Sequence, residues 1–350
     1  MRPRKVKRWL IVLGLLHGAV LCAGFFAPYN PETQDRDSAY LPPTRLHLVD
    51  AQGHFHLRPF AYGYQLQEDS FERLHEDTTL RVPLRFFVKG SRYHLLGFLP
   101  CSRHLFGAAA GRIYLLGSDA YGRDQLSRIF YGGQISLLAG LLGATVTLLV
   151  GTGIGTLAGY YGGWRDGLLM RLTELFAALP WLYLLFALRA FLPLAVSPLE
   201  AFLLVILVIG AVGWARPARL VRGVVLSAKE RDFVRAARGF GASDIYLLRR
   251  HIFPAASSVL LTQAAILIPQ FVLAEMTLSF LGLGVPEPVP SWGNLLANLQ
   301  QYSVLVSYWW MYLPAFAIVP FYLGYLGLAN ALQEHFDPYK ITVGSLGGLK

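Results

Sequence analysis

The chain of 350 residues is 54% hydrophobic and only 15% charged, whereas an ordinary soluble domain carries about 25% charged residues. Its apolar residues form long runs of the kind that crosses a hydrocarbon layer about 30 Å thick, which excludes an ordinary soluble protein. The net charge of +10 does not favour nucleic-acid binding, because the basic residues lie between the apolar runs instead of forming one stripe with exposed aromatic residues. The two cysteines are too few for a disulfide framework.

The chain begins with a basic stretch that leads into an apolar segment. Five basic residues lie between Arg2 and Arg8, and the apolar segment of 19 residues runs from Trp9 to Ala27. A cleaved signal peptide is the alternative interpretation, but its apolar core is shorter and ends at a small-x-small cleavage site. No such site stands out near Ala27. We therefore expect residues 1–27 to form a cytoplasmic tail and the first transmembrane helix, an uncleaved signal anchor.

Residues 28–115 contain two stretches in which apolar and polar residues alternate, as they do in half-buried strands. The first stretch flanks a predicted turn at 50–53, and the second flanks a predicted turn at Lys89 and Gly90. The alternating apolar residues are Leu46, Leu48, Phe55, Leu57, Leu84, Phe86, Val88, Tyr93 and Leu95. We expect a small β-rich extracytoplasmic insertion and favour a folded spacer over a domain that binds a partner.

Five more apolar stretches follow the insertion. They lie near 134–160, 168–194, 199–214, 257–283 and 308–332, and each is expected to be a helix because a backbone in lipid must satisfy its own hydrogen bonds. The predicted fold class is an all-α polytopic membrane protein with six transmembrane helices and a small β-rich insertion after the first helix. The transmembrane domain is expected to cover 116–340, followed by a C-terminal tail at 341–350.

The basic residues between the helices predict the orientation of the chain. Nine Lys and Arg residues lie between Arg216 and Arg250, and Arg165 and Arg171 lie in another short loop, whereas the short segments near 193–198 and 285–307 have none. Short cytoplasmic loops are enriched in Lys and Arg. The sequence therefore predicts that both termini and the loop at 228–256 are cytoplasmic.

Three glycines spaced four residues apart, Gly151, Gly155 and Gly159, lie late in the second predicted helix. Small residues at this spacing let two helix backbones approach closely. We favour packing within the subunit, and contact with a partner subunit is the alternative.

The loop at 228–256 is too polar to cross a membrane and contains a short helical pattern. Ala236, Ala237 and Gly241 place small side chains on adjacent turns, where another protein can approach closely. Asp232 or Ser227 is expected to cap the start of this helix, and Pro254 is expected to end the segment.

This loop resembles the cytoplasmic coupling loop of permeases from binding-protein-dependent ABC importers. In that family Glu-Ala-Ala, a Gly four residues after the second Ala, and a later Pro form the coupling helix. Ala236, Ala237, Gly241 and Pro254 match those positions, whereas Arg235 stands where the family usually has Glu.

Two further stretches resemble the dipeptide, oligopeptide and nickel transporter branch of the family. The first, at 116–128, is similar to the segment before the second helix of that branch, and the second, at 278–294, is similar to the outer end of its fifth helix. The resemblance covers roughly Leu115 to Lys340 and leaves the insertion outside it.

The resemblance implies a permease subunit of an ATP-driven importer of peptides or similar solutes in the bacterial cytoplasmic membrane, with no enzymatic activity and no cofactor of its own. The implied partners are a second homologous permease, two cytoplasmic ATPase subunits, an extracytoplasmic solute-binding protein and the bilayer, with no nucleic acid. A nickel or other small-solute importer of the same branch is the alternative. The residues implied in ATPase coupling are Arg235, Ala236, Ala237, Gly241, His251 and Pro254.

Several single residues have more than one interpretation. Glu275 lies inside the fifth predicted helix, where a carboxylate is costly; it either lines the solute path, is a protonated or hydrogen-bonded packing residue, or faces the partner permease. Arg189 lies nearer a helix end, from which its long side chain is expected to reach the membrane surface.

Asp119 and Asp124 are expected to form turns and helix caps, rather than a catalytic pair. His251 lacks a second metal ligand at a suitable spacing, so we expect a structural contact. Interfacial aromatic anchors are expected at Trp292, Trp309 and Trp310.

The sequence argues against two other classes of membrane protein. An intramembrane enzyme needs a recognisable nucleophile or metal set, and neither Gly-x-Ser-x-Gly nor His-Glu-x-x-His occurs. A secondary transporter or channel is the less favoured alternative, because internal repeats are not evident. The chain also lacks the Gly-x-x-x-x-Gly-Lys loop that binds nucleotide phosphates, so energy is expected to come from a partner.

Overall fold

A computed structural model describes residues 2–66, 74–108, 111–191, 193 and 195–336. The chain divides into two compact units. One comprises Met1–Leu16, Ser136–Val285 and Ile318–Lys350, and the other comprises His17–Ile135 and Pro286–Ala317. The predicted tail at 341–350 lies outside the described residues.

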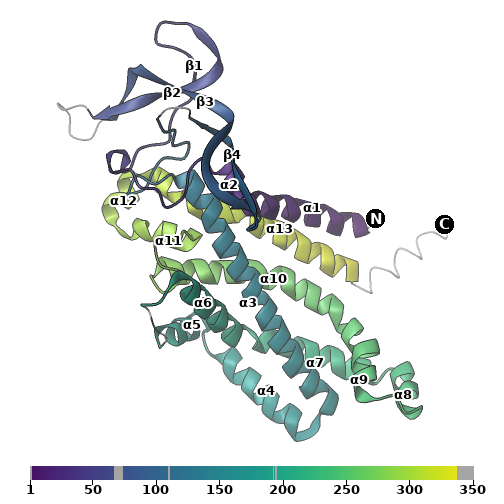
Figure 1. Cartoon of the computed structure of the whole chain (residues 1–350). Coiled ribbons are helices and arrows are strands. Elements are labelled where there is room, and N and C mark those ends of the chain that lie inside the picture. Colours follow the sequence, from purple (N-terminus) through teal and green to yellow (C-terminus); the bar gives the residue numbers. More distant parts are fainter. Residues whose placement is uncertain (1, 67–73, 109–110, 192, 194, 337–350) are drawn as a thin grey trace, which may run out of the picture. The chain divides into compact units, whose positions relative to one another are not determined.

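The described part of the chain is mainly helical (Figure 1). The α-helices are α1 (Arg2–Leu21), α2 (Ala23–Phe26), α3 (Gln125–Tyr161), α4 (Gly163–Ala178), α5 (Trp181–Ala190), α6 (Pro198–Gly213), α7 (Ala215–Lys229), α8 (Asp232–Gly239), α9 (Asp244–Leu247), α10 (Phe253–Phe280), α11 (Trp292–Ala297), α12 (Tyr302–Ser307) and α13 (Leu313–Phe336). Short 3-10 or π-helical turns lie at Arg36–Ser38, Leu248–Ile252, Asn298–Gln300 and Trp309–Tyr312.

Three helical segments of the described residues are long and apolar enough to cross a membrane. They are Gln125–Tyr161, Asp244–Phe280 and Trp309–Phe336. Two bent pairs, α4 with α5 and α6 with α7, raise the number to five if each pair makes one crossing. The helical class of the fold is confirmed by these segments. The segment Asp244–Phe280 also shows that the second half of the predicted polar loop is helical and leads directly into α10.

The predicted single helix at 168–194 is wrong. The structure instead has α4 and α5, whose axes differ by 91°. Leu179 has an extended backbone, with ψ of 136°, and Pro180 precedes the first residue of α5. Because proline disfavours the helical conformation of the residue before it, a helix tends to stop at such a position.

The glycines of α3 pack against α7, as expected for packing within the subunit. A Cβ atom at Gly151 would lie 2.9 Å from the Trp214 carbonyl oxygen, and a Cβ at Gly155 would overlap the Ala218 carbonyl oxygen. A Cβ at Gly159 would lie 2.9 Å from Val225 Cβ. The two helix backbones therefore touch along three turns of α3.

The predicted β-rich region is an antiparallel sheet in the order β1-β2-β3-β4. Its strands are β1 (His47–Val49), β2 (Phe55–Leu66), β3 (Leu74–Leu95) and β4 (Leu99–Ala108). The turn predicted near 50–53 is present, since the Asp50 carboxylate accepts hydrogen bonds from the backbone N–H groups of Gln52 and His54.

The turn predicted at Lys89 and Gly90 is wrong. Strand β3 continues through both residues, and its pairing with β4 shifts register between Lys89 and Tyr93. Glycine inside a strand often marks a bulge or a close approach rather than a turn. A Cβ atom at Gly90 would lie 2.7 Å from His104 Cδ2, so the glycine makes room for that ring.

The segment before α3 uses Asp119 and Asp124 as a turn residue and a helix cap, as predicted. Asp119 Oδ1 accepts hydrogen bonds from the N–H groups of Tyr121 and Arg123. Asp124 Oδ2 accepts from the N–H of Ser127 at 2.8 Å. Burial raises the pKa of the Asp124 carboxyl to about 6. Both residues therefore organise the start of α3.

Two of the three tryptophans predicted to be interfacial anchors are buried. Trp292 and Trp310 are 1% and 6% exposed, and their indole N–H groups donate to the carbonyl oxygens of Ile129 and Ser118. A buried indole needs such an acceptor. Trp309 is 61% exposed. Of the three tryptophans, only this one has the exposure expected of an interfacial anchor.

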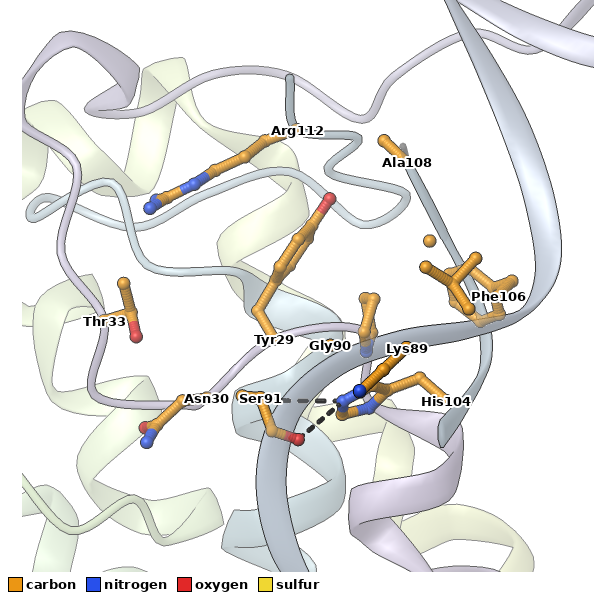
Figure 2. A pocket seen from close by; sticks show the side chains of 13 residues that line it. Tyr29, Asn30, Thr33, Lys89, Gly90, Ser91, His104, Phe106, Ala108 and Arg112 are labelled. Carbon is orange, nitrogen blue, oxygen red and sulfur yellow. Dashed lines mark hydrogen bonds between the residues drawn. The ribbon is translucent and has the colours of Figure 1, made fainter. Parts of the chain in front are cut away.

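A cavity of about 170 Å³ lies between strands β3 and β4 and the segment after α2. Its lining carries the basic residues Lys89 and Arg112 and the imidazole of His104 (Figure 2). The dashed lines in Figure 2 join His104 Nε2 to the carbonyl and hydroxyl oxygens of Ser91, at 3.1 and 3.5 Å. His104 Nδ1 lies 2.6 Å from the carbonyl oxygen of Ala27.

Candidate functional site

The predicted short helix in the polar loop is α8, which follows α7 after a break of two residues. Its N-cap is Arg231, whose side chain makes no capping hydrogen bond. Asp232 is the first helical residue and Ser227 lies inside α7, so neither caps α8 as expected. Asp232 instead places a negative charge in the first turn, which the helix dipole favours.

The end of α8 is a Schellman motif built around Gly241. The Gly241 N–H donates to the Arg238 carbonyl oxygen, and the Ala242 N–H donates to the Ala237 carbonyl oxygen, both at 3.0 Å. Gly241 has φ of +84°, which glycine adopts without the penalty that a Cβ atom brings. A Cβ at Gly241 would meet nothing within 4 Å in the chain. The glycine is thus required by backbone conformation, and it lies beyond the small-residue helix face on which it was expected.

One side of α8 is held against the rest of its unit. Val234 is 1% exposed, and the Arg238 guanidinium lies 5.4 Å from the ring centre of Tyr160. The Tyr160 hydroxyl donates to Asp244 Oδ1. Lys229 Nζ donates to the Gly159 carbonyl oxygen at 2.9 Å. Contacts to the end of α3 therefore fix α8 and the start of α9.

The opposite side of α8 is an exposed apolar stripe of Phe233, Ala236 and Phe240. These residues are spaced by three and four, which places them on one helix face. Phe233 is 52% exposed and Phe240 is 92% exposed. Ile245 and Tyr246 continue the exposed apolar surface onto α9.

The sequence pattern indicated the alanine of this stripe but not its phenylalanines. The available signal was two aromatic residues seven positions apart in a segment otherwise rich in arginine. Ala237, by contrast, lies half-buried, away from the centre of the stripe.

Arg235 lies beside the stripe and pairs with an acidic residue of its own loop. Its guanidinium donates to Glu230 Oε2 at 2.5 Å, and both side chains are largely exposed. This hydrogen bond lowers the pKa of the Glu230 carboxyl. An exposed pair of this kind contributes little stability. Arg235 and Glu230 can therefore exchange partners at little cost in free energy.

His251 and Pro254 lie close to the stripe in sequence and differ in their contacts. The His251 ring centre lies 5.4 Å from that of Phe233 and 5.8 Å from that of Tyr246, which is a structural contact of the kind expected. Pro254 lies in the first turn of α10, directly after the π-helical turn Leu248–Ile252, within the continuous helical segment Asp244–Phe280. It therefore starts α10 instead of ending the loop.

Glu275 is fully buried in α10. Ser279 Oγ donates to Glu275 Oε1 at 2.6 Å and accepts from the N–H of Val285 at 3.3 Å. These bonds join Glu275 to the residues that end α10. These contacts fit a packing residue, and a place on the solute path stays a prediction.

Arg189 does not reach outward from its helix as expected. Its side chain is 1% exposed, with Nε donating to the Leu283 carbonyl oxygen at 2.6 Å and a terminal nitrogen donating to that of Pro193 at 3.0 Å. Arginine suits this role because its donors are fixed in a planar fork. It links the end of α5 to the residues after α10.

These observations define a class: a polytopic helical membrane protein with a short surface helix held between long apolar helices. The chain belongs to the family described as binding-protein-dependent transport system inner membrane component, which matches residues 151–340. It is thus a multi-pass inner-membrane permease subunit, and the resemblance drawn from the loop motifs is confirmed.

Named relatives agree with this family. The chain is 34% identical over 223 residues to the dipeptide transport system permease protein DppC of Bacillus subtilis, covering 63% of this chain and 68% of the relative. It is 38% identical over 225 residues to the oligopeptide transport system permease protein OppC of Escherichia coli, covering 64% and 72%. Among solved structures it is similar to the inward-facing MetNI methionine ABC transporter, with 16% identity, a TM-score of 0.44, and coverage of 58% and 94%.

Proposed function

We propose that this chain is the permease subunit of a peptide importer and that the apolar stripe on α8 docks a cytoplasmic ATPase subunit. The relatives named above transport dipeptides and oligopeptides by their names, which supports a peptide cargo over the nickel alternative. Six transmembrane helices, with α1 as the first and both termini in the cytoplasm, complete the proposal. The sheet of β1 to β4 then belongs to an extracytoplasmic insertion at 28–115.

The observation that carries the proposal is the exposure of Phe233 and Phe240 on a helix that is otherwise well fixed. A phenylalanine that is 92% exposed has no packing role within the chain, whereas aromatic residues are enriched at the centres of protein interfaces. Val234 and Arg238 hold the other side of α8. A well-fixed helix with an exposed apolar surface is suited to transmit the movement of an ATPase subunit to this chain.

Coupling requires the α8 surface to bind the two states of the ATPase with different affinity, since a contact of equal strength in both would shift no equilibrium. ATP hydrolysis itself is assigned to the partner. Arg235 can contribute to the difference because it is able to leave Glu230 at little cost.

Replacing Phe240 with serine is the sharpest test of the docking role. Loss of an aromatic anchor at an interface typically costs about 2 kcal/mol or more, so the variant is expected to lose most of the ATPase that co-purifies with this chain from membranes. The matched control is Phe191→Ser, because Phe191 is the C-cap residue of α5 and is 88% exposed. Equal ATPase recovery with both variants would contradict docking through α8.

A further inference from the structure

The hairpin of β3 and β4 ends in an exposed apolar tip. Leu96 and Leu99 are each 46% exposed, and Phe98 is 68% exposed. The turn comprises Leu96, Gly97 and Phe98, with Phe98 N–H donating to the Leu95 carbonyl oxygen at 3.3 Å. A tip in water would be expected to carry polar residues.

The turn also has a leucine in the left-handed backbone region, which is unusual. Leu96 has φ of +55° and Gly97 has φ of +84°. Glycine, asparagine and aspartate are the usual residues in this backbone region because their side chains tolerate it. Leucine gains nothing there from local structure. The leucine at this position is therefore better explained by a contact that the tip makes outside the hairpin.

The stem of the hairpin runs beside α2 towards the end of α1 (Figure 1). Far from the tip, Phe87 contacts Phe25, with ring centres 6.3 Å apart, and His104 Nδ1 lies 2.6 Å from the Ala27 carbonyl oxygen. Nearer the tip, Tyr93 packs on Gly24, where a Cβ atom would overlap the tyrosine ring.

The contacts of Tyr93 extend the same trend towards α1. Burial raises the pKa of the Tyr93 hydroxyl, and the nearby thiols of Cys101 and Cys22 raise it further. Cys22 immediately follows the last residue of α1. From His104 to Tyr93, the contact of the hairpin thus moves from Ala27 to Gly24, two residues from Cys22 and the end of α1.

The hairpin is strongly basic around its apolar tip. The part of the hairpin from Arg81 to Ala108, which includes the tip, has no Asp or Glu and five Lys or Arg residues, and the two acidic residues of β3, Glu76 and Asp77, lie at its far end. Arg92, Lys89 and Arg103 lie in the two strands and are exposed. Apolar tips flanked by basic side chains bind membrane surfaces that contain anionic lipid, because the first enter the acyl region and the second meet the phosphates.

We propose that the tip at Leu96, Phe98 and Leu99 inserts into the outer leaflet of the bilayer, with the flanking basic residues on the lipid phosphates. The inference rests on the proposed function, in which α1 crosses the membrane and the insertion lies outside. It gives the insertion a role as a second, peripheral membrane anchor beside the first helix.

Single fluorophores test this placement in the full chain, reconstituted with the subunits that co-purify with it. Cys22 and Cys101 are first replaced by serine, and an environment-sensitive dye is attached to Phe98→Cys. The matched site is Gln52→Cys in the exposed turn between β1 and β2. Vesicles of phosphatidylcholine and phosphatidylglycerol carry a spin-labelled lipid as the membrane quencher, and iodide is the aqueous quencher.

The dye at position 98 is expected to emit at shorter wavelength and to lose fluorescence to the spin-labelled lipid but not to iodide. The dye at position 52 should show the reverse. Quenching of position 98 by iodide overturns the insertion of the tip, and so does protection from iodide that appears only when the solute-binding protein is added. Labelling of position 52 in intact spheroplasts by a membrane-impermeant maleimide checks the topology separately, and failure there overturns both proposals.

Discussion

Two glycines at the C-terminal end of α8, Gly239 and Gly241, illustrate how one residue type meets different demands two positions apart. Gly239 is the last helical residue, whereas Gly241 has φ of +84° and closes the Schellman motif. Neither would place a Cβ within 4 Å of another part of the chain. Only Gly241 is therefore required by the backbone.

Gly241→Ala is expected to weaken the end of α8 by about 1–2 kcal/mol, the cost of the left-handed conformation for a residue with a Cβ atom. The measurement is amide hydrogen exchange of Gly241 and Ala242 in the reconstituted protein, whose N–H groups make the two closing bonds. Both amides should lose protection. Gly239→Ala is the control and should leave protection unchanged or higher, because alanine favours a helix over glycine. Similar exchange in both variants would refute this role.

At the scale of elements, the packing of α3 on α7 depends on the absence of side chains along one line of α3. Gly151, Gly155 and Gly159 bring the two backbones together, whereas Gly153 lies on another side of α3 with nothing within 4 Å of a Cβ atom. Close backbone contact is a main source of helix association in membranes, since lipid removes most of the hydrophobic driving force.

Gly155→Ala is expected to lower the stability of the subunit by about 1–3 kcal/mol, the usual range for overpacking, because its Cβ would overlap the Ala218 carbonyl oxygen. The thermal midpoint of the detergent-solubilised protein, followed by tryptophan fluorescence, measures the loss. Gly153→Ala is the matched control in the same helix and should leave the midpoint equal or higher. An equal decrease for both variants would show that α3 does not approach α7 in this way.

At the scale of the whole molecule, the proposed function requires subunits beyond this chain. Neither an ATP-binding phosphate loop nor a second permease is present in its sequence. The proposed assembly has one copy of this chain, one copy of a different permease and two ATPase subunits.

Native mass spectrometry of the complex purified through a tag on this chain tests that composition. The expected mass corresponds to a single copy of this 38.8 kDa chain together with the three other subunits. Two copies of the chain in every complex would show a homodimeric permease, and active transport by such a complex without any ATPase would overturn the importer assignment.

The sequence by itself determined the class of protein, the presence of the surface helix α8 and the close packing of the α3 glycines. Each of these follows from local physics. Long apolar runs need lipid, glycines at intervals of four lie on one face of a helix, and a polar stretch with small residues forms a helix between two such runs.

Only the tertiary structure decided which side chains are buried or exposed. Trp292 and Arg189 are buried because carbonyl oxygens distant in sequence accept their hydrogen bonds. Strand β3 runs through Gly90, where the missing side chain leaves room for the ring of His104. The hairpin turns near the exposed Phe98 instead. Phe240 is exposed because α8 is held by Val234 on its other side. Such outcomes depend on contacts between segments far apart in the chain, and local patterns carry no record of those contacts.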